Sequence, residues 1–433
     1  MTNVHDPYAA LRNRDVQLYV SGRTAGVVGW QILQVALGWE LYERTHSALA
    51  LGLVGLATAL PVVILALPAG HLADTVDRRR ILIWAQVAFI ITGLGLAAVS
   101  YWRGPVALVY VILLARGAVQ AYNNPARQAL LPQLVPPELF GNAVTWGSSA
   151  FQIASVVGPG LGGIIVAIER RATGAYLIST ILIGLSLWSL IEIRGGGAAS
   201  QTDAKPREKV TLRSIAAGMR FVRDTKVILA AITLDLFAVL LGGATALLPI
   251  FAKDILHVGP DGLGWLRAAP SVGALIVALA IAHRPLLTRT GALLLFSVAG
   301  FGISTIVFGL SRSFWLSMIM LFLLGAFDGV SMIIRSTLVQ MRTPDEMRGR
   351  VSAVNSVFID MSNELGGFES GALAALVGPV TAVVAGGVGT LIVVGSVALA
   401  WPELRVLGPL VEPVFSEPTI EESPDPSGAR QQT

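Results

Sequence analysis

Long apolar stretches alternate with short polar segments along the 433-residue chain. Twelve of these stretches supply about 20 mostly apolar residues each, the length that a helix needs to cross the hydrocarbon core of a bilayer. Helices are expected because no water inside a bilayer can satisfy the peptide groups of irregular chain. The predicted spans are residues 17–41, 48–70, 81–101, 105–124, 140–168, 174–194, 227–252, 259–282, 290–310, 314–340, 347–376 and 377–401.

A polar break divides the spans into six before it and six after it, which predicts two helical halves at residues 17–194 and 227–401. The break, residues 195–226, begins with the composition of a linker and ends with an amphipathic run that we expect to lie as a helix on the membrane surface. Residues 1–16 and 402–433 are the polar ends of the chain. The second is expected to be a disordered tail, because it is rich in Pro, Ser and acidic residues.

The two halves share an internal repeat. Residues 117–163 align without gaps on residues 325–371, and the matched positions include Arg127 with Arg335 as well as a Pro and a Glu in matched loops. Matched charges are harder to attribute to chance than matched apolar residues. Because each half contains an even number of spans, the repeats run parallel, and such halves usually rock against each other around a site between them.

The composition excludes a soluble fold of this length. Hydrophobic residues make up 54% of the chain and charged residues 13%, against about 25% charged residues in an ordinary soluble domain. The absence of cysteine excludes thiolate metal sites, and the five histidines show no ligand spacing, so no metal or cofactor is expected. The sequence also lacks a phosphate-binding loop and a nucleophile with its base. The chain is therefore predicted not to be an enzyme.

Lys and Arg residues are distributed unevenly between the two sides of the predicted membrane. Twenty of the 31 lie in segments on the same side as both chain ends, and six lie in the opposite loops. Under the positive-inside rule, this asymmetry predicts that both termini are cytoplasmic in a bacterial plasma membrane. The net charge of +4 then reflects topology, and no nucleic-acid partner is expected.

A sequence signature occupies the turn between the second and third spans, where the chain reads GHLADTVDRRRIL. It resembles the signature GxLaDrxGrkxxL of the major facilitator superfamily, from which Thr75 and Asp77 depart. The resemblance implies an all-α polytopic membrane protein with the major facilitator fold, twelve transmembrane helices in two six-helix halves. The acid at Asp77 and the run PARQALLPQLV are similar to the drug:proton antiporter branch, which includes the enterobactin exporter and macrolide efflux pumps.

The resemblance also implies a cytoplasmic gate at this turn. The positions expected to form it are Gly70, Asp74, Arg78 and Arg79. In the family, the acid that corresponds to Asp74 faces the start of the eleventh helix, here residues 346–350, where free N–H groups and the helix dipole favour an anion. Such a contact would lock the two halves together on the inside. The alternative is a basic turn that serves topology alone.

The fifth span contains a second signature, SVVGPGLGG, which resembles the GPxxGG signature of the superfamily's antiporters. The residues concerned are Gly158, Pro159, Gly162 and Gly163. Pro159 removes a helical hydrogen bond and the glycines permit close approach, so a kinked and tightly packed helix is expected. This signature favours export over uptake. Ordinary packing of small residues is the alternative.

Several ionisable residues lie at membrane depth, where each is costly without a partner, a water-filled cavity or a role. The candidates for proton coupling are Arg116, Asp235, Asp328 and Glu364. Arg116 matches the arginine of the superfamily's fourth-helix signature and is expected to bias a nearby carboxylate between its protonated and ionised states, unless it only bonds a carbonyl. Asp235 and Asp328 have apolar neighbours, which favour a protonated carboxyl group. The alternative for both is a packing role, paired with Arg116, Arg267 or Arg335.

A substrate cavity is expected beside these groups. Asp360 and Glu364 stand four residues apart on one face of the eleventh span, where a row of acids could pass protons or attract a cationic substrate. Asn355 adds a hydrogen-bonding group, and Gln31 and Gln34 of the first span are expected to line the same cavity.

The predicted function is secondary active export of an amphipathic small molecule, such as a drug or a siderophore, by proton antiport with alternating access. The expected partners are the substrate, protons and the lipid bilayer, and the chain is expected to act as a monomer with the proton gradient as its energy source. The main alternative is proton-coupled symport or uptake of a small metabolite. A membrane receptor or a membrane-embedded enzyme fits the pattern less well.

Overall fold

The computed structural model describes residues 6, 8–193, 212–283 and 289–408. Most of the predicted linker and the tail from residue 409 therefore lie outside the described residues. The prediction of disorder is wrong for the start of the tail, because Pro402–Arg405 forms a short helix in which Leu404 is fully buried. Inside the helices, the side chains of Asp74 and Asp360 also lie outside the description. All regular structure in the described ranges is helical.

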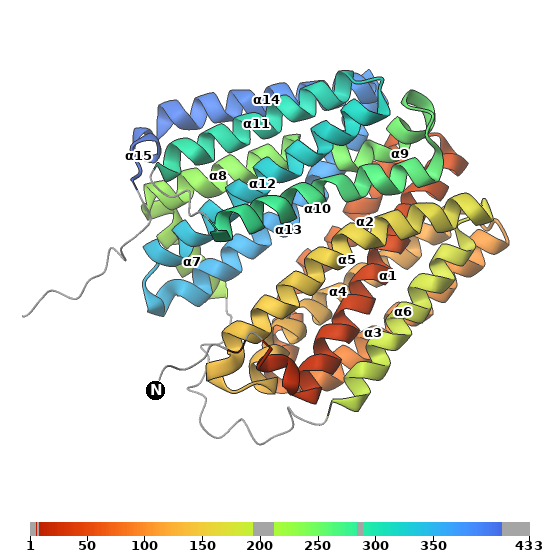
Figure 1. Ribbon diagram of the computed structural model, residues 1–433, viewed down its shortest axis with the longest axis horizontal. Coiled ribbons are helices and arrows are strands. Elements are labelled where there is room, and N and C mark those ends of the chain that lie inside the picture. Colours follow the sequence, from red (N-terminus) through yellow and green to blue (C-terminus); the bar gives the residue numbers. More distant parts are fainter. Residues whose placement is uncertain (1–5, 7, 194–211, 284–288, 409–433) are drawn as a thin grey trace, which may run out of the picture.

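Every predicted span of the first half is a helix (Figure 1). These helices are α1 (Arg14–Thr45), α2 (Ala48–Thr75), α3 (Arg78–Tyr101), α4 (Val106–Leu134), α5 (Phe140–Glu169) and α6 (Thr173–Glu192), with short 3-10 turns η1 (Ala10–Arg12) and η2 (Pro137–Leu139). Asp77 begins α3 as its N-cap, because its Oδ1 accepts a hydrogen bond from the backbone N–H of Arg79 at 2.8 Å. This departure from the superfamily signature therefore stabilises the start of a helix. The helix α4 continues beyond the predicted fourth span, through Pro125 to Leu134.

The remaining helices lie at the end of the linker, in the second half and just after it (Figure 1). They are α7 (Leu212–Asp224), α8 (Lys226–Leu241), η4 (Ala244–Leu247), α9 (Leu248–Ile250), the π-helical turn η5 (Phe251–Ile255), α10 (Gly259–His283), α11 (Thr290–Leu310), α12 (Phe314–Arg342), α13 (Asp345–Val377), α14 (Pro379–Ala400) and α15 (Pro402–Arg405). Ten of the described helical segments are long and apolar enough to cross a membrane by length and composition. With α1 and α13, which have 32 and 33 residues, they make the twelve predicted spans.

The seventh span is broken, which corrects the prediction of one continuous helix over 227–252. The helix α8 ends before Gly242 and Gly243, and the chain continues through η4, α9 and η5. A Cβ at Gly243 would lie 2.7 Å from the carbonyl carbon of Gly366, so the break brings this part of the chain against the backbone of α13. Pro249 then enters the first turn of α9, where a missing N–H costs nothing.

The two halves meet at one end of the molecule, where α2 and α10 begin and α5 and α13 end (Figure 1). We call this the closed end. Backbones cross there in direct contact, because a Cβ at Gly163 of α5 would lie 2.9 Å from the Cα of Gly264 of α10, and one at Gly52 of α2 would lie 3.0 Å from the Cα of Gly371 of α13. One apolar core cluster at this end draws residues from both halves, Leu41 and Phe251 among them.

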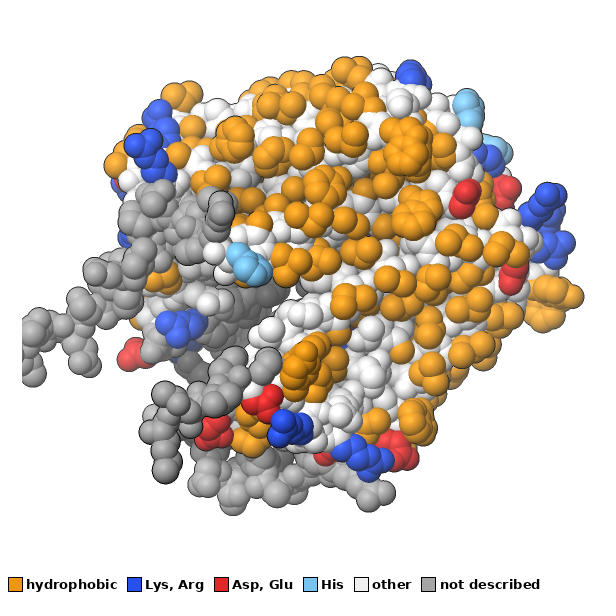
Figure 2. Space-filling view, viewed as in Figure 1, with side chains coloured by type: hydrophobic (Ala, Val, Ile, Leu, Met, Phe, Trp, Pro, Cys, Tyr) orange, Lys and Arg blue, Asp and Glu red, His pale blue; other side chains and the backbone are white. Residues whose placement is uncertain are grey.

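At the opposite end, which we call the open end, the halves are apart. A Cβ built at Gly70, Gly141 or Gly349 meets no atom within 4 Å. Figure 2 shows the surface hollowed between the halves toward this end. The helix α7 also lies at this end and packs on the start of α13, since Val222 is buried in a cluster with Val351 and Val354.

The outer surface of the bundle suits a lipid environment. Hydrophobic side chains cover the middle of the face in Figure 2, whereas charged side chains gather toward its two ends. Large apolar residues on this kind of surface are strongly exposed, for example Leu399 at 75% and Trp315 at 73%. A belt of exposed apolar side chains between charged ends is typical of a bundle that spans a bilayer.

Candidate functional site

A central cavity of about 620 Å³ lies between the two halves. The first half contributes Gln31 and Gln34 from α1, which were predicted to line it. The second half contributes three ionisable groups, Arg267, Asp328 and Glu364. The break of the seventh span forms another part of the wall, because Gly242 and Gly243 line the same space.

Glu364 connects the halves at this cavity. Thr58 of α2 donates a hydrogen bond from its Oγ1 to the Glu364 carboxylate at 3.1 Å. Arg267 of α10 lines the same cavity, interacts electrostatically with Glu364, and reaches the backbone carbonyl of Gln34 at 3.5 Å. A carboxylate in this position contributes to the contact between the halves, so a change in its charge would alter that contact.

Asp328 belongs to α12 of the second half and lines the central cavity. It also borders a small neighbouring cavity that Asp235 and Ser331 line. Among the described residues, no hydrogen bond or ion pair involves the Asp328 carboxyl group. Asp328 is therefore an acid at membrane depth that faces a cavity.

Asp235 has a different environment. It forms an ion pair with Arg335 of α12, and both side chains are almost completely buried, with 9% and 5% exposure. This is the alternative weighed from the sequence, a packing carboxylate neutralised by an arginine. Asp235 does not line the central cavity, so the geometry favours a structural role for it over a role in coupling.

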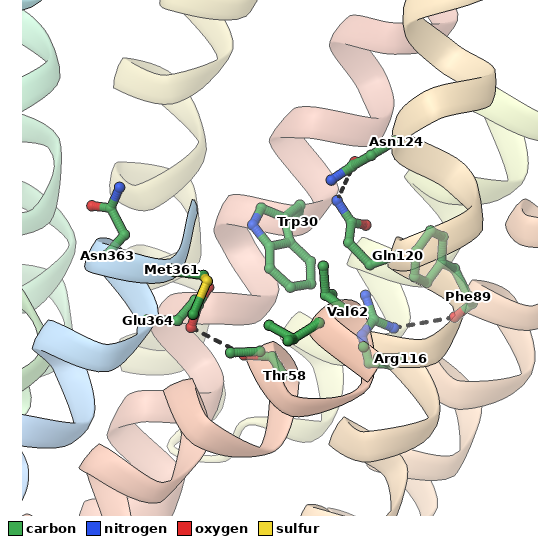
Figure 3. Close-up of a pocket in the computed structure, with 13 residues that line it drawn as sticks. Trp30, Thr58, Val62, Phe89, Arg116, Gln120, Asn124, Met361, Asn363 and Glu364 are labelled. Carbon is green, nitrogen blue, oxygen red and sulfur yellow. Dashed lines mark hydrogen bonds between the residues drawn. The ribbon is translucent and has the colours of Figure 1, made fainter. Parts of the chain in front are cut away.

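A second, smaller cavity of about 230 Å³ adjoins the central one on the side of the first half (Figure 3). We call it the side pocket. Asn363 and Glu364 line both cavities. Its other walls come from the first half and from α13; the residues labelled in Figure 3 are Trp30, Thr58, Val62, Phe89, Arg116, Gln120, Asn124, Met361, Asn363 and Glu364.

Arg116 lies at the end of the side pocket away from Glu364 (Figure 3). Only 2% of this residue is exposed, and its Cζ lies 5.3 Å from the ring centre of Trp30 and 5.0 Å from that of Phe89. One Nη donates to the Phe89 carbonyl at 3.3 Å and to Thr92 Oγ1 at 3.1 Å. The nearby carboxylate expected for Arg116 is not found within 4 Å among the described residues.

Of the remaining predicted cavity residues, Asn355 lies in α13 but lines neither cavity. The side chain of Asp360 is outside the described residues. Gln120 and Asn124, by contrast, were not predicted. They follow Arg116 at steps of four residues along α4, and Gln120 donates to Asn124 at 2.7 Å. A polar stripe at this spacing in an apolar helix was the sequence signal that could have identified them.

The glycines of the α5 signature make close contacts with neighbouring helices. A Cβ at Gly158 would lie 2.6 Å from Gln31 Cβ, and one at Gly162 would lie 3.0 Å from Ile32 Cα, so both face α1. Gly163 faces α10 across the closed end. The helix runs without interruption through Pro159, which is buried. The segment thus makes close contacts both within its own half and between the halves.

The turn before α3 is tied to its own half. Arg79 donates from Nε to the Leu190 carbonyl at 2.9 Å and from Nη2 to the Ile191 carbonyl at 2.5 Å, both at the end of α6. Gly70 has open space around it, and Arg78 is half-buried. The gate contact expected for Asp74 lies outside the described side chains and stays a prediction.

Two parallel helical halves around a central polar cavity define the class of protein: a membrane transporter with the major facilitator fold. The model for the transmembrane secretion effector family matches residues 5–424, and the chain belongs to that family. Membership in a transporter family confirms the predicted fold and the prediction that the chain is not an enzyme.

Relatives and solved structures agree with this assignment. The enterobactin exporter EntS of Escherichia coli O1:K1 / APEC is 28% identical over 386 residues, which cover 88% of this chain and 91% of the exporter. A bacterial homologue of the human lysosomal transporter Spinster, in an inward-facing and unoccupied conformation, has a TM-score of 0.69 at 14% identity, over 92% of this chain and 99% of that one. A POT family transporter in complex with a thioalcohol conjugated peptide has a TM-score of 0.70 at 12% identity, over 90% and 96%.

Proposed function

We propose that this transporter is a secondary active exporter, which moves an amphipathic small molecule out of a bacterial cell in exchange for protons. The observation that carries the proposal is the central cavity between the halves, with Asp328 and Glu364 in its wall. Export is supported by the similarity to the enterobactin exporter over nearly the whole chain. A drug or a siderophore is the corresponding class of substrate, and we expect the chain to act as a monomer in the plasma membrane.

Alternating access accounts for the two unlike ends. If both termini are cytoplasmic, as the Lys and Arg distribution predicts, the open end faces the cytoplasm and substrate enters the central cavity from there. Rocking of the halves would then close the open end and separate the glycine contacts of the closed end. Midplane sites between parallel repeats operate in this way.

Protonation of Glu364 is expected to promote the movement of the two halves against each other. As an anion it accepts a hydrogen bond from Thr58 across the interface and interacts with Arg267. A proton on Glu364 removes the charge from these contacts and weakens the hold between the halves, because charge-assisted hydrogen bonds are roughly twice as strong as neutral ones. Asp328, in the same cavity, is a second acid to which a proton can bind. Exchange follows if substrate and protons occupy the cavity alternately.

The test uses inverted membrane vesicles with an acid interior, and enterobactin and Hoechst 33342 as probes. Wild-type vesicles should accumulate a probe, and a protonophore should abolish the accumulation. Asp328→Asn and Glu364→Gln should each remove most of the gradient-driven part. Asp224→Asn, an exposed acid at the end of α7, is the control and should transport normally. Accumulation that survives the protonophore would contradict antiport, and gradient-driven uptake into right-side-out vesicles would favour symport.

A further inference from the structure

The side pocket contains a buried cation for which the described residues supply no anion. Arg116 is 2% exposed, has no carboxylate within 4 Å among these residues, and its buried Nε makes no hydrogen bond. Burying a guanidinium without an anionic partner costs free energy, because the solvation lost from water is not replaced. An anion that enters the pocket from outside the chain would offset this cost.

Two other buried arginines of the bundle have an acid beside them. Arg335 is neutralised by Asp235 in an ion pair, and Arg267 interacts electrostatically with Glu364. Both of these cations therefore have an acid of the protein itself nearby. Arg116 has instead two aromatic rings, a carbonyl and a hydroxyl group as neighbours. Its positive charge remains available to a ligand that lies in the side pocket.

The shape of the side pocket suits a flat group. The rings of Trp30 and Phe89 contact the guanidinium group of Arg116, and Val62 adds an apolar surface beside them (Figure 3). Aromatic faces and a planar guanidinium bind planar groups well, because stacking and a two-pronged hydrogen bond can form together. The volume of about 230 Å³ is below the roughly 300–1,000 Å³ of complete ligand pockets. The pocket therefore fits part of a molecule.

The rest of that molecule has a continuous place to lie. Asn363 and Glu364 line both cavities, so a ligand that passes them extends from the side pocket into the central cavity. The Glu364 carboxylate stands at the side of the pocket opposite Arg116 (Figure 3). It repels an anionic group and attracts a hydroxyl or amino donor, which fixes the direction in which a ligand with one anionic end enters.

We infer that the side pocket is a subsite for the anionic end of the exported molecule. A planar group with a carboxylate or phenolate oxygen binds there, with that oxygen at Arg116 and the remainder of the molecule past Glu364 in the central cavity. The inference rests on the proposed function, since it names the charge class of the cargo. The acids of α13 by themselves favour a cationic substrate. The subsite instead predicts a cargo with an anionic end.

Two probes of equal shape test this subsite. 2-Naphthoate carries the anionic group and 2-naphthamide is its neutral counterpart. Binding of each to the purified full chain in detergent is measured by ligand-observed NMR at neutral pH. Wild-type protein should bind naphthoate with a dissociation constant at least about tenfold lower than that of naphthamide, as expected for a charge-assisted hydrogen bond. Arg116→Gln should bring the ratio of the two constants close to one.

Arg127→Gln is the matched control, because Arg127 is an arginine of the same helix that lines neither cavity. This variant should keep the preference for naphthoate. Equal affinity of the wild type for both probes, absence of naphthoate binding, or a preference that survives Arg116→Gln would overturn the subsite. The wild-type comparison holds even if Arg116→Gln does not fold, and Trp30→Leu, which should weaken both probes alike, then supplies a second variant.

These measurements separate the subsite from the proposed function. Binding in detergent needs no gradient, so an Arg116-dependent preference without gradient-driven transport in vesicles would overturn antiport and leave the subsite in place. Proton-driven export by a protein without that preference would overturn the subsite and leave the function.

Discussion

Individual acids in the apolar spans look alike in the sequence and differ sharply in the structure. Asp235 and Asp328 both have apolar neighbours, so the sequence assigned them the same candidate role. Arg335 follows Asp328 by seven residues, two helical turns, yet it pairs with Asp235 of α8 instead. Which acid meets an arginine depends on how the helices are rotated against each other. A single sequence contains no direct record of that rotation.

The Asp235–Arg335 pair gives a prediction about stability. Asp235→Asn leaves the Arg335 guanidinium buried without its counter-charge, and breaking a buried pair in this way costs about 3–5 kcal/mol. Thermal unfolding in detergent should therefore show a clearly lower midpoint for Asp235→Asn than for the wild type.

The control replaces both partners. Asp235→Leu combined with Arg335→Met removes both charges and fills the space with apolar groups, an exchange that is often neutral or stabilising. The double variant should unfold close to the wild type. An Asp235→Asn variant with an unchanged midpoint would show that the pair does not carry stability.

The helices themselves could be predicted well from the sequence, and their interruptions could not. Length and apolar content placed all twelve spans, and the repeat gave their parallel arrangement, because burial in lipid demands these features of any chain. Two glycines were compatible with a continuous helix, so the break at Gly242 was not predicted. The sequence also did not show that α4 continues through Pro125, beyond the predicted fourth span.

The close contacts between helices at the closed end require glycine, which has no side chain. A Cβ at Gly163 would lie 2.9 Å from Gly264 Cα, a distance at which backbone must move, whereas one at Gly160 meets nothing within 4 Å. Gly163→Ala should therefore open the closed end, and Gly160→Ala should leave it unchanged. Spin labels on Ile168→Cys and Asp261→Cys report the separation of α5 and α10, and the chain contains no other cysteine.

The mean distance between these labels should increase by at least about 1–2 Å in Gly163→Ala, the size of helix shifts at interfaces. Gly160→Ala should reproduce the wild-type distance. Equal distances in all three proteins would mean that the glycine contact does not hold this end together.

The orientation of the whole molecule can be tested with single cysteines. Gly349 lies at the open end with space around it, and Arg171 is an exposed residue in the loop between α5 and α6 at the closed end. If the open end faces the cytoplasm, a membrane-impermeant maleimide should label Arg171→Cys in intact spheroplasts and Gly349→Cys only after permeabilisation. The reverse pattern would invert the orientation and, with it, the direction of export.

Part of the cargo chamber is built from main chain. Where the seventh span stops at Gly242 and Gly243, no side chain stands between the peptide groups and the space they border. A side chain added at either position would collide with atoms already packed there, Phe301 at Gly242 and the Gly366 carbonyl at Gly243. Larger residues are therefore disfavoured here, and a molecule bound against this part of the wall meets peptide groups.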